Sequence, residues 1–193
     1  MDQLDRDPTR RRILEAALTC FNATGMAGTT IRHIQEASSI SVGSIYHHFG
    51  DKEGIAFALY QLGIEDMHQA LLRRLGGRAD LSLTIRGCVD DYLDWYRDHA
   101  ELGRHLFQFS DTRFVAGRES AIAALGREFL DRFGELAEDE GWGGRLDAEF
   151  AVRFVTGGCR EFLRSWLVTQ DSVELEAARP RLQDLALATF GLH

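Results

Sequence analysis

The placement of proline constrains the fold of this chain more than any other feature of its sequence. Only two of the 193 residues are proline, Pro8 and Pro180, so 171 consecutive residues lie between them without one. Proline lacks a backbone donor and clashes with the preceding helical turn, so its absence over such a length favours helix. The sequence therefore predicts an all-α protein.

The composition is that of an ordinary globular protein, with 45% hydrophobic and 27% charged residues. No apolar run approaches the roughly 20 residues that span a bilayer. The charged N-terminal sequence MDQLDRDPTRRR also lacks the apolar centre of a signal peptide. We therefore expect a cytoplasmic protein with no membrane partner.

The three cysteines, Cys20, Cys88 and Cys159, lie far apart and form no CxxC pair. This spacing argues against a zinc knuckle or a redox dithiol, and buried structural thiols are the simpler interpretation. The adjacent pair His47 and His48 is no better as a metal site, because neighbouring residues on a helix point about 100° apart. We expect neither a metal nor a cofactor.

The net charge of −8 is unevenly distributed along the chain. Residues 1–52 carry six basic and six acidic side chains, whereas residues 53–193 carry sixteen basic and twenty-four acidic ones. A neutral-to-basic N-terminal segment followed by an acidic remainder is compatible with DNA binding by the N-terminal segment. Arg10, Arg11 and Arg12 crowd one helical turn, either as a solvated charge run or as contacts to phosphate.

Four helix starts are visible in the first third of the chain. Asp7 is a candidate N-cap before Pro8, and Gly25 ends the helix that follows. A threonine, Thr29 or Thr30, caps a short second helix with Ile31, Ile34 and Ala37 on one face. Ser41 caps a third helix, with Ile45 and Phe49 inside, and Asp51 caps a fourth.

Helices two and three, separated by a turn of about four residues, are typical of a helix-turn-helix over about residues 30–49. The second helix of such a unit enters the major groove of DNA. Its outward residues are small or polar, which lets the helix approach base edges closely. They are Ser41, Val42, Gly43, Ser44, His47 and, less clearly, His48.

The stretch ILEAALTCFNATGMAGTTIRHIQEASSISVGSIYHHFGDKEGI resembles the DNA-binding domain of the TetR/AcrR family of transcriptional regulators over roughly residues 10–56. Two positions depart from the family pattern. Ser39 stands where the family has a turn glycine, so we expect a β-carbon at a positive φ. Gln35 replaces a common alanine.

The resemblance implies roles for individual residues. Tyr46, Lys52 and one of Thr29 and Thr30 would contact phosphates, and His47 would contact the DNA backbone or a base edge. His48 matches a histidine that packs at the inner edge of the domain.

The resemblance also implies two domains: a DNA-binding domain over residues 1–52 and a ligand-binding and dimerisation domain over residues 53–193. Helical patterns in the second recur at 53–75, 81–99, 101–109, 119–140, 147–169 and 173–191. A pocket for a small-molecule inducer is expected among its aromatic residues, with Arg104, His99 or His105 as a polar anchor. The candidates are Trp95, Tyr96, Phe107, Phe129, Phe133 and Phe154.

The last two helices are candidates for a homodimer surface, with an internal core as the alternative. The first carries aromatic residues together with small residues that permit close approach, and leucines recur on the second. These residues are Phe154, Gly157, Gly158, Phe162 and Trp166, then Leu182, Leu185, Leu187 and Phe190.

A rival function is suggested by DDYLD at residues 90–94, which fits the DDxxD motif of magnesium-dependent helical enzymes that transfer prenyl groups. The chain is short for that fold and lacks a second aspartate-rich motif. The sequence thus favours a homodimeric repressor over an enzyme. We expect a small-molecule inducer to release this repressor from a palindromic DNA operator.

Overall fold

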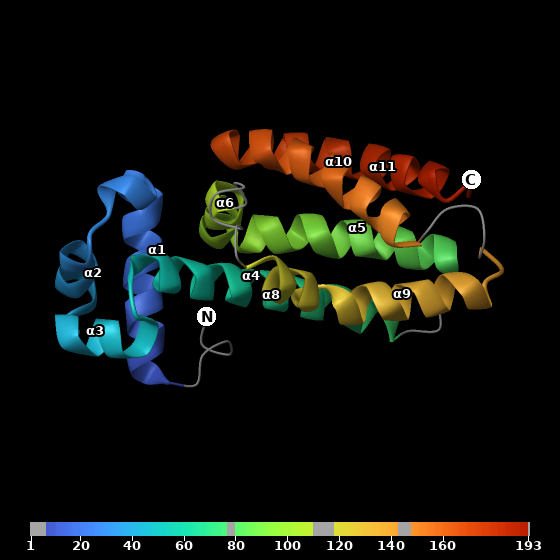
Figure 1. Ribbon diagram of the computed structural model, residues 1–193. Coiled ribbons are helices and arrows are strands. Elements are labelled where there is room, and N and C mark those ends of the chain that lie inside the picture. Colours follow the sequence, from blue (N-terminus) through green and yellow to red (C-terminus); the bar gives the residue numbers. More distant parts are fainter. Residues whose placement is uncertain (1–6, 77–79, 110–117, 143–147, 193) are drawn as a thin grey trace. The chain divides into compact units, whose positions relative to one another are not determined.

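The computed structural model describes residues 7–76, 80–109, 118–142 and 148–192 (Figure 1). Every regular element in these ranges is an α-helix, which confirms the predicted all-α class. The helices are α1 (Pro8–Gly28), α2 (Ile31–Ser38), α3 (Val42–Phe49), α4 (Lys52–Leu75), α5 (Leu81–Asp98), α6 (Ala100–Phe109), α8 (Glu119–Leu125), α9 (Arg127–Asp139), α10 (Ala148–Thr169) and α11 (Ser172–Thr189). Within the described ranges, no helix is both long and apolar enough to cross a membrane.

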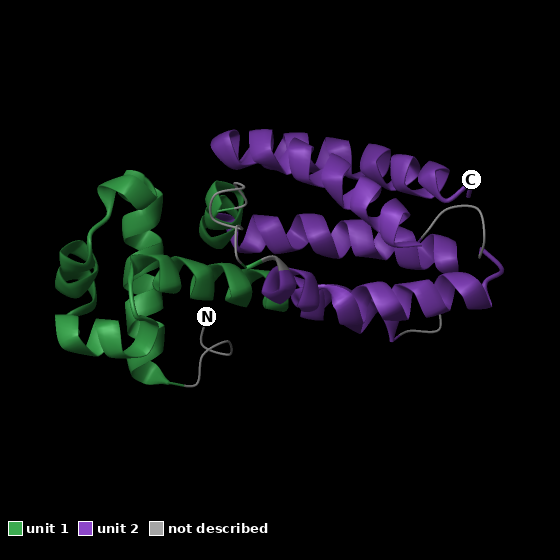
Figure 2. Ribbon diagram, in the orientation of Figure 1, with its two compact units in different colours: residues 1–66, 101–119 green, residues 67–100, 120–193 purple. Residues whose placement is uncertain are grey.

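The chain divides into two compact units (Figure 2). The first comprises residues 1–66 and 101–119, and the second comprises residues 67–100 and 120–193. Helix α4 contributes its first part to one unit and its last part to the other. The functional boundary at residue 52 stays a prediction.

The first unit is built on α1, which packs against α2, while α2 packs against α3. Its core contains Leu14, Phe21, Ile34 and Ile45, each almost completely buried. Their helical spacing was the signal that predicted these elements. The prediction for Ala37 is wrong: it is exposed, and the next residue, Ser38, is buried instead.

All four helix caps that the sequence predicts are formed. The Oδ1 atom of Asp7 accepts from Thr9 N at 2.8 Å, and that of Asp51 accepts from Gly54 N at 2.6 Å. The hydroxyls of Thr30 and Ser41 each accept a bond of 3.2 Å from the amide three residues later. Such a cap contributes about 1 kcal/mol, so these side chains fix where the short helices begin.

Gly25 and Ser39 are two of the described residues of the first unit that have a positive φ. Gly25, at φ 69° and ψ 174°, interrupts the helical geometry of α1 where the sequence predicts an end. Ser39, at φ 57° and ψ 26°, is left-handed, as expected from its place in the family pattern. A residue with a Cβ costs about 1 kcal/mol more than glycine in this conformation.

In the second unit, α11 packs along α5, and α10 packs against α5, α9 and α11. The prediction of a single helix over 119–140 is wrong, because α8 ends at Leu125 and α9 begins at Arg127. His68 on α4 explains the break. Its Nδ1 lies 2.8 Å from the carbonyl oxygen of Leu125, and its ring fills the space where a side chain at Gly126 would sit.

Candidate nucleic-acid interface

Helices α2 and α3 form a helix-turn-helix with a tightly specified turn. Ser39, Ile40 and Ser41 separate the two helices, and the hydroxyl of Ser38 accepts from Ile40 N at 3.2 Å. Ile34 and Ile45 are buried at the junction. The inner side of α3 therefore packs in the core, and its opposite side faces outward.

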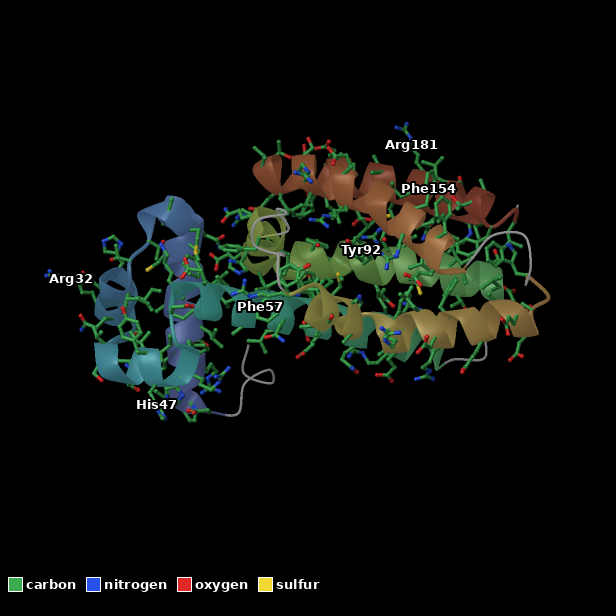
Figure 3. All side chains as sticks on the ribbon, viewed as in Figure 1. Arg32, His47, Phe57, Tyr92, Phe154 and Arg181 are labelled. Atoms are coloured by element: carbon green, nitrogen blue, oxygen red, sulfur yellow. The ribbon has the colours of Figure 1, made fainter. Side chains whose placement is uncertain are left out.

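The outer face of α3 carries most of the predicted contact residues. Val42 is 41% exposed and Tyr46 is 49% exposed. Gly43 and His47 are also exposed, and Ser44 is half-buried. Because residues four apart share a helix face, Val42 with Tyr46 and Gly43 with His47 form a continuous strip, with His47 at the surface (Figure 3).

His48 belongs to the inner edge of the unit, as the family resemblance implies. It is half-buried, and its Nδ1 lies 3.8 Å from Oδ2 of Asp7. Its carbonyl oxygen accepts from the guanidinium of Arg10 at 3.2 Å, and that guanidinium also stacks 4.5 Å from the ring centre of Phe49. The two adjacent histidines thus have different environments.

The basic residues at the N-terminus tie the helices of this unit together. Arg10 joins α1 to the end of α3, and Arg12 donates to the carbonyl of Ser38 at 2.8 Å. The sequence suggested either a solvated charge run or phosphate contacts for these arginines. It did not predict that Arg10 and Arg12 would donate to backbone carbonyls. The sequence carries no signal for them, because the acceptors are backbone carbonyls far along the chain.

Two other predicted phosphate contacts have intramolecular partners. Nζ of Lys52 donates to the carbonyls of Met26 and Thr29 at 2.7 and 2.8 Å. These carbonyls lie at the C-terminal end of α1, where a positive charge is stabilised by the helix dipole. Thr29 is only 1% exposed, and its hydroxyl donates to the carbonyl of Gly25 at 2.8 Å. Thr30 is exposed beside them and caps α2.

The second unit contains a small apolar cavity of about 40 Å³. Helices α4, α5, α9 and α10 and the C-terminal end of α11 contribute its walls. The lining residues are Leu71, Ile85, Cys88, Val89, Tyr92, Phe129, Phe133, Val152, Val155, Thr156, Cys159 and Phe190. Burial raises the pKa of the Cys88 thiol to about 12 and that of Cys159 to about 11, so both thiols are neutral.

Only two of the six predicted pocket residues line this cavity. Phe129 and Phe133 line the cavity. Trp95 and Tyr96 are buried but do not line it. Their ring centres lie 5.0 Å apart in an edge-to-face arrangement. Phe154 is 64% exposed.

The other predicted pocket residue, Phe107, and two of the three candidate anchors lie on α6. Phe107 and Arg104 are half-buried in the first unit. His105 bonds the carbonyl of Ala56 at 3.0 Å. The third candidate anchor, His99, bonds the carbonyl of Trp95 at 3.0 Å. None of these side chains lines the cavity.

The aspartates of DDYLD are bound by arginine side chains. Arg179 on α11 donates to Asp90 at 3.0 Å and to Asp94 at 2.7 Å. Arg74 forms a bidentate pair with Asp91 at 2.7 and 2.9 Å. No group of three potential metal-ligating side chains occurs in the parts of the chain that the structure describes. The motif therefore links α5 to α11 and α4.

A family model described as bacterial regulatory proteins, tetR family, matches residues 13–59, which contain the helix-turn-helix. The repressor AcnR of Corynebacterium glutamicum is 36% identical over 100 residues, covering 51% of this chain and 50% of AcnR. The repressor Rv1474c of Mycobacterium tuberculosis is 32% identical over 126 residues, covering 64% and 65%. The chain thus matches less than two thirds of the length of either relative.

The fold extends the similarity over nearly the whole chain. FadR of Bacillus halodurans, a fatty acid degradation regulator, has a TM-score of 0.79 at 17% identity, covering 95% of this chain and 96% of FadR. FadR of Bacillus subtilis in complex with stearoyl-CoA has a TM-score of 0.72 at 18% identity, covering 95% and 99%. Residues 13–59 thus match the model of the tetR family of bacterial regulatory proteins, and the fold of nearly the whole chain is similar to that of solved regulators.

Proposed function

We propose that this protein is a sequence-specific DNA-binding repressor that acts as a homodimer in the cytoplasm and is released from a palindromic operator by a small-molecule ligand. The observation that carries the proposal is the outward strip of α3, whose exposed residues Val42, Gly43, Tyr46 and His47 are small, polar or aromatic rather than uniformly charged. The names of the repressors AcnR and Rv1474c support the same function.

The strip has the groups that DNA recognition needs. The Tyr46 hydroxyl and the His47 imidazole can donate to phosphate oxygens or base edges. The exposed residues Thr30 and Ser41 add hydroxyl groups at the starts of α2 and α3. Two such strips, related by a dimer axis, would enter major grooves about 34 Å or more apart.

The ligand site that we propose is the apolar cavity of the second unit. At about 40 Å³ it is far smaller than the roughly 300 Å³ or more of a site for a drug-sized ligand. Binding therefore requires lining side chains such as Phe129 and Phe133 to change rotamer. The stearoyl-CoA complex of FadR from Bacillus subtilis supports the idea that this fold responds to ligands.

The same proposal assigns no catalysis to the chain. An enzyme that uses Asp90 and Asp94 to hold magnesium needs these carboxylates to face the metal, but both accept bonds from Arg179. Replacing that arginine by a metal would remove two of the bonds that join α5 to α11. The aspartate-rich motif is better explained as part of the packing.

A selection experiment tests the function. Purified protein is used to enrich duplexes from a random DNA pool, and the affinity of the enriched sequence is measured by fluorescence anisotropy at two salt concentrations. We expect a palindrome, with log affinity falling by about 0.9 per neutralised phosphate for each unit of log salt. Tyr46→Ala and His47→Ala each remove one contact from both half-sites and should each weaken binding about a hundredfold, at about tenfold per charge-assisted bond.

Arg127→Ala, an exposed change on α9 in the second unit, is the matched control and should leave the affinity unchanged. If no sequence is enriched, or if the Tyr46 and His47 variants bind as tightly as this control, the proposed DNA contact surface is wrong.

A further inference from the structure

Val42 presents apolar surface in the first turn of α3. It is 41% exposed, whereas Ile45, one turn further along the same helix, is 1% exposed. A single exposed valine usually needs no explanation. This one stands at the N-terminal end of the second helix of a helix-turn-helix, where side chains reach base edges in the major groove.

The chemistry of the major groove limits what a valine can recognise there. Base edges present hydrogen-bond donors and acceptors, and thymine adds an apolar C5-methyl group. The neighbours of Val42 on α3 do not discriminate among bases, because the hydroxyls of Ser41 and Ser44 can donate or accept. The apolar side chain is therefore the group in this turn that can select one base.

Gly43 supports a close approach of this turn to DNA. A Cβ at this position would meet nothing within 4 Å among the described residues, and its φ lies outside the left-handed range. Neither internal packing nor backbone geometry explains a glycine that lowers helix propensity by about 1 kcal/mol. Close approach of the backbone to a ligand is the remaining reason for glycine.

We propose that Val42 recognises a thymine methyl group in each half-site of the operator. The inference rests on the proposed DNA-binding function and adds the chemistry of one recognised base. Burying one methyl group against the valine changes the binding constant about fourfold. Two half-sites together should change it about fifteenfold.

Deoxyuridine provides the test, because it differs from thymidine only by this methyl group. Starting from the duplex enriched from the random pool, each thymine is replaced singly by uracil, and the dissociation constant is measured by fluorescence anisotropy. We expect one position in each half-site at which uracil weakens wild-type binding about fourfold. Uracil at both positions should weaken it about fifteenfold.

Two variants that differ by one methyl group assign the effect to Val42. Val42→Ser should bring the ratio of uracil to thymine dissociation constants close to one, whereas Val42→Thr keeps a γ-methyl group and should keep the discrimination. Leu83→Ser is the control, because Leu83 is 60% exposed on α5, outside both the strip on α3 and the last two helices. It should retain the wild-type ratio.

The outcomes separate this inference from the function on which it rests. Failure to enrich any sequence would overturn the DNA-binding function itself. The inference alone is overturned in three cases: the enriched half-site contains no thymine, uracil is tolerated at every position, or Val42→Ser keeps the wild-type ratio. Thermal unfolding of each variant shows whether it is folded.

Discussion

At the scale of single residues, Arg12 and Lys52 of the first unit donate to backbone carbonyls. Lys52 ends α1 through Met26 and Thr29, and Arg12 binds the carbonyl of Ser38. These bonds occupy some of the N–H donors of the two side chains but leave their positive charges in place. We interpret Lys52 first as a helix-ending residue, whose loss would weaken DNA binding through the shape of the unit.

Gly43 gives a prediction in which stability and affinity change in opposite directions. Gly43→Ala should raise the free energy of unfolding by up to about 1 kcal/mol, because alanine has the higher helix propensity and its Cβ meets nothing. DNA affinity should fall, since the added methyl group holds the backbone away from the bases. Urea unfolding and anisotropy measure the two effects, and unchanged affinity would contradict the close approach.

His105 predicts a pH dependence of stability. It is completely buried on α6, and its Nδ1 has no hydrogen-bond partner among the described residues. Burial lowers its pKa from 6.5 to about 4. Between these values the unfolded chain binds a proton that the native state does not, so stability falls as the pH drops through this window and is unaffected by His105 above it.

The loss between pH 7 and pH 4 should be on the order of 3 kcal/mol, from about 1.4 kcal/mol per pKa unit. Urea unfolding of wild type and His105→Leu at both pH values measures it. The variant should lose less stability than wild type by that amount. Equal losses would contradict the lowered pKa of His105 and show that its ring is solvated in the native state.

At the scale of helices, contacts between elements decide where helices end and which pairs stay together. His68 on α4 interrupts what the periodicity predicts as one helix, by holding Leu125 and packing against Gly126. Arg179 joins α11 to α5 through two aspartates of a motif that resembles a metal site.

Arg179→Ala should lower the free energy of unfolding by about 1–3 kcal/mol, because it leaves two partly buried carboxylates without their shared cation. Arg97→Ala is the matched control. Arg97 also bonds Asp94 but is more exposed, so its loss should cost less than about 1 kcal/mol. Urea unfolding of both variants gives the comparison, and equal effects would show that the Arg179 contacts contribute no more than surface pairs.

At the scale of the whole molecule, α10 and α11 expose several large apolar side chains. The exposed members are Phe150, Phe154, Val168, Val173 and Leu185. A second copy is the partner that we propose, because a palindromic operator requires a two-fold symmetric protein. Trp166, Leu187 and Phe190, which the sequence also suggested for this surface, are instead buried within the chain.

Phe154→Arg should convert the proposed dimer into a monomer, because it places a charge in an apolar interface. Sedimentation equilibrium measures the mass, which for the single chain is 21.7 kDa. Leu83→Arg, at an exposed leucine on α5, is the control and should leave the mass unchanged. Assembly by both variants as in wild type would rule out this surface as the interface.

The sequence by itself determined the helical class, the four caps and the helix-turn-helix. Each depends on residues within a few positions of one another, where side-chain spacing and backbone preference act locally. The left-handed conformation of Ser39 was expected from the family resemblance instead, because a residue with a Cβ does not favour that conformation.

Only the tertiary structure decided which aromatic residues surround the cavity, why α8 and α9 separate, and what Lys52 and the DDYLD aspartates bind. Phe129 lines the cavity while Trp95, an equally plausible candidate by sequence, packs elsewhere. These outcomes depend on how each helix is rotated about its axis and on partners far along the chain. Successive residues of a helix point about 100° apart, so side chains project from every side of it. The packing of the neighbouring helices decides which of these side chains are buried.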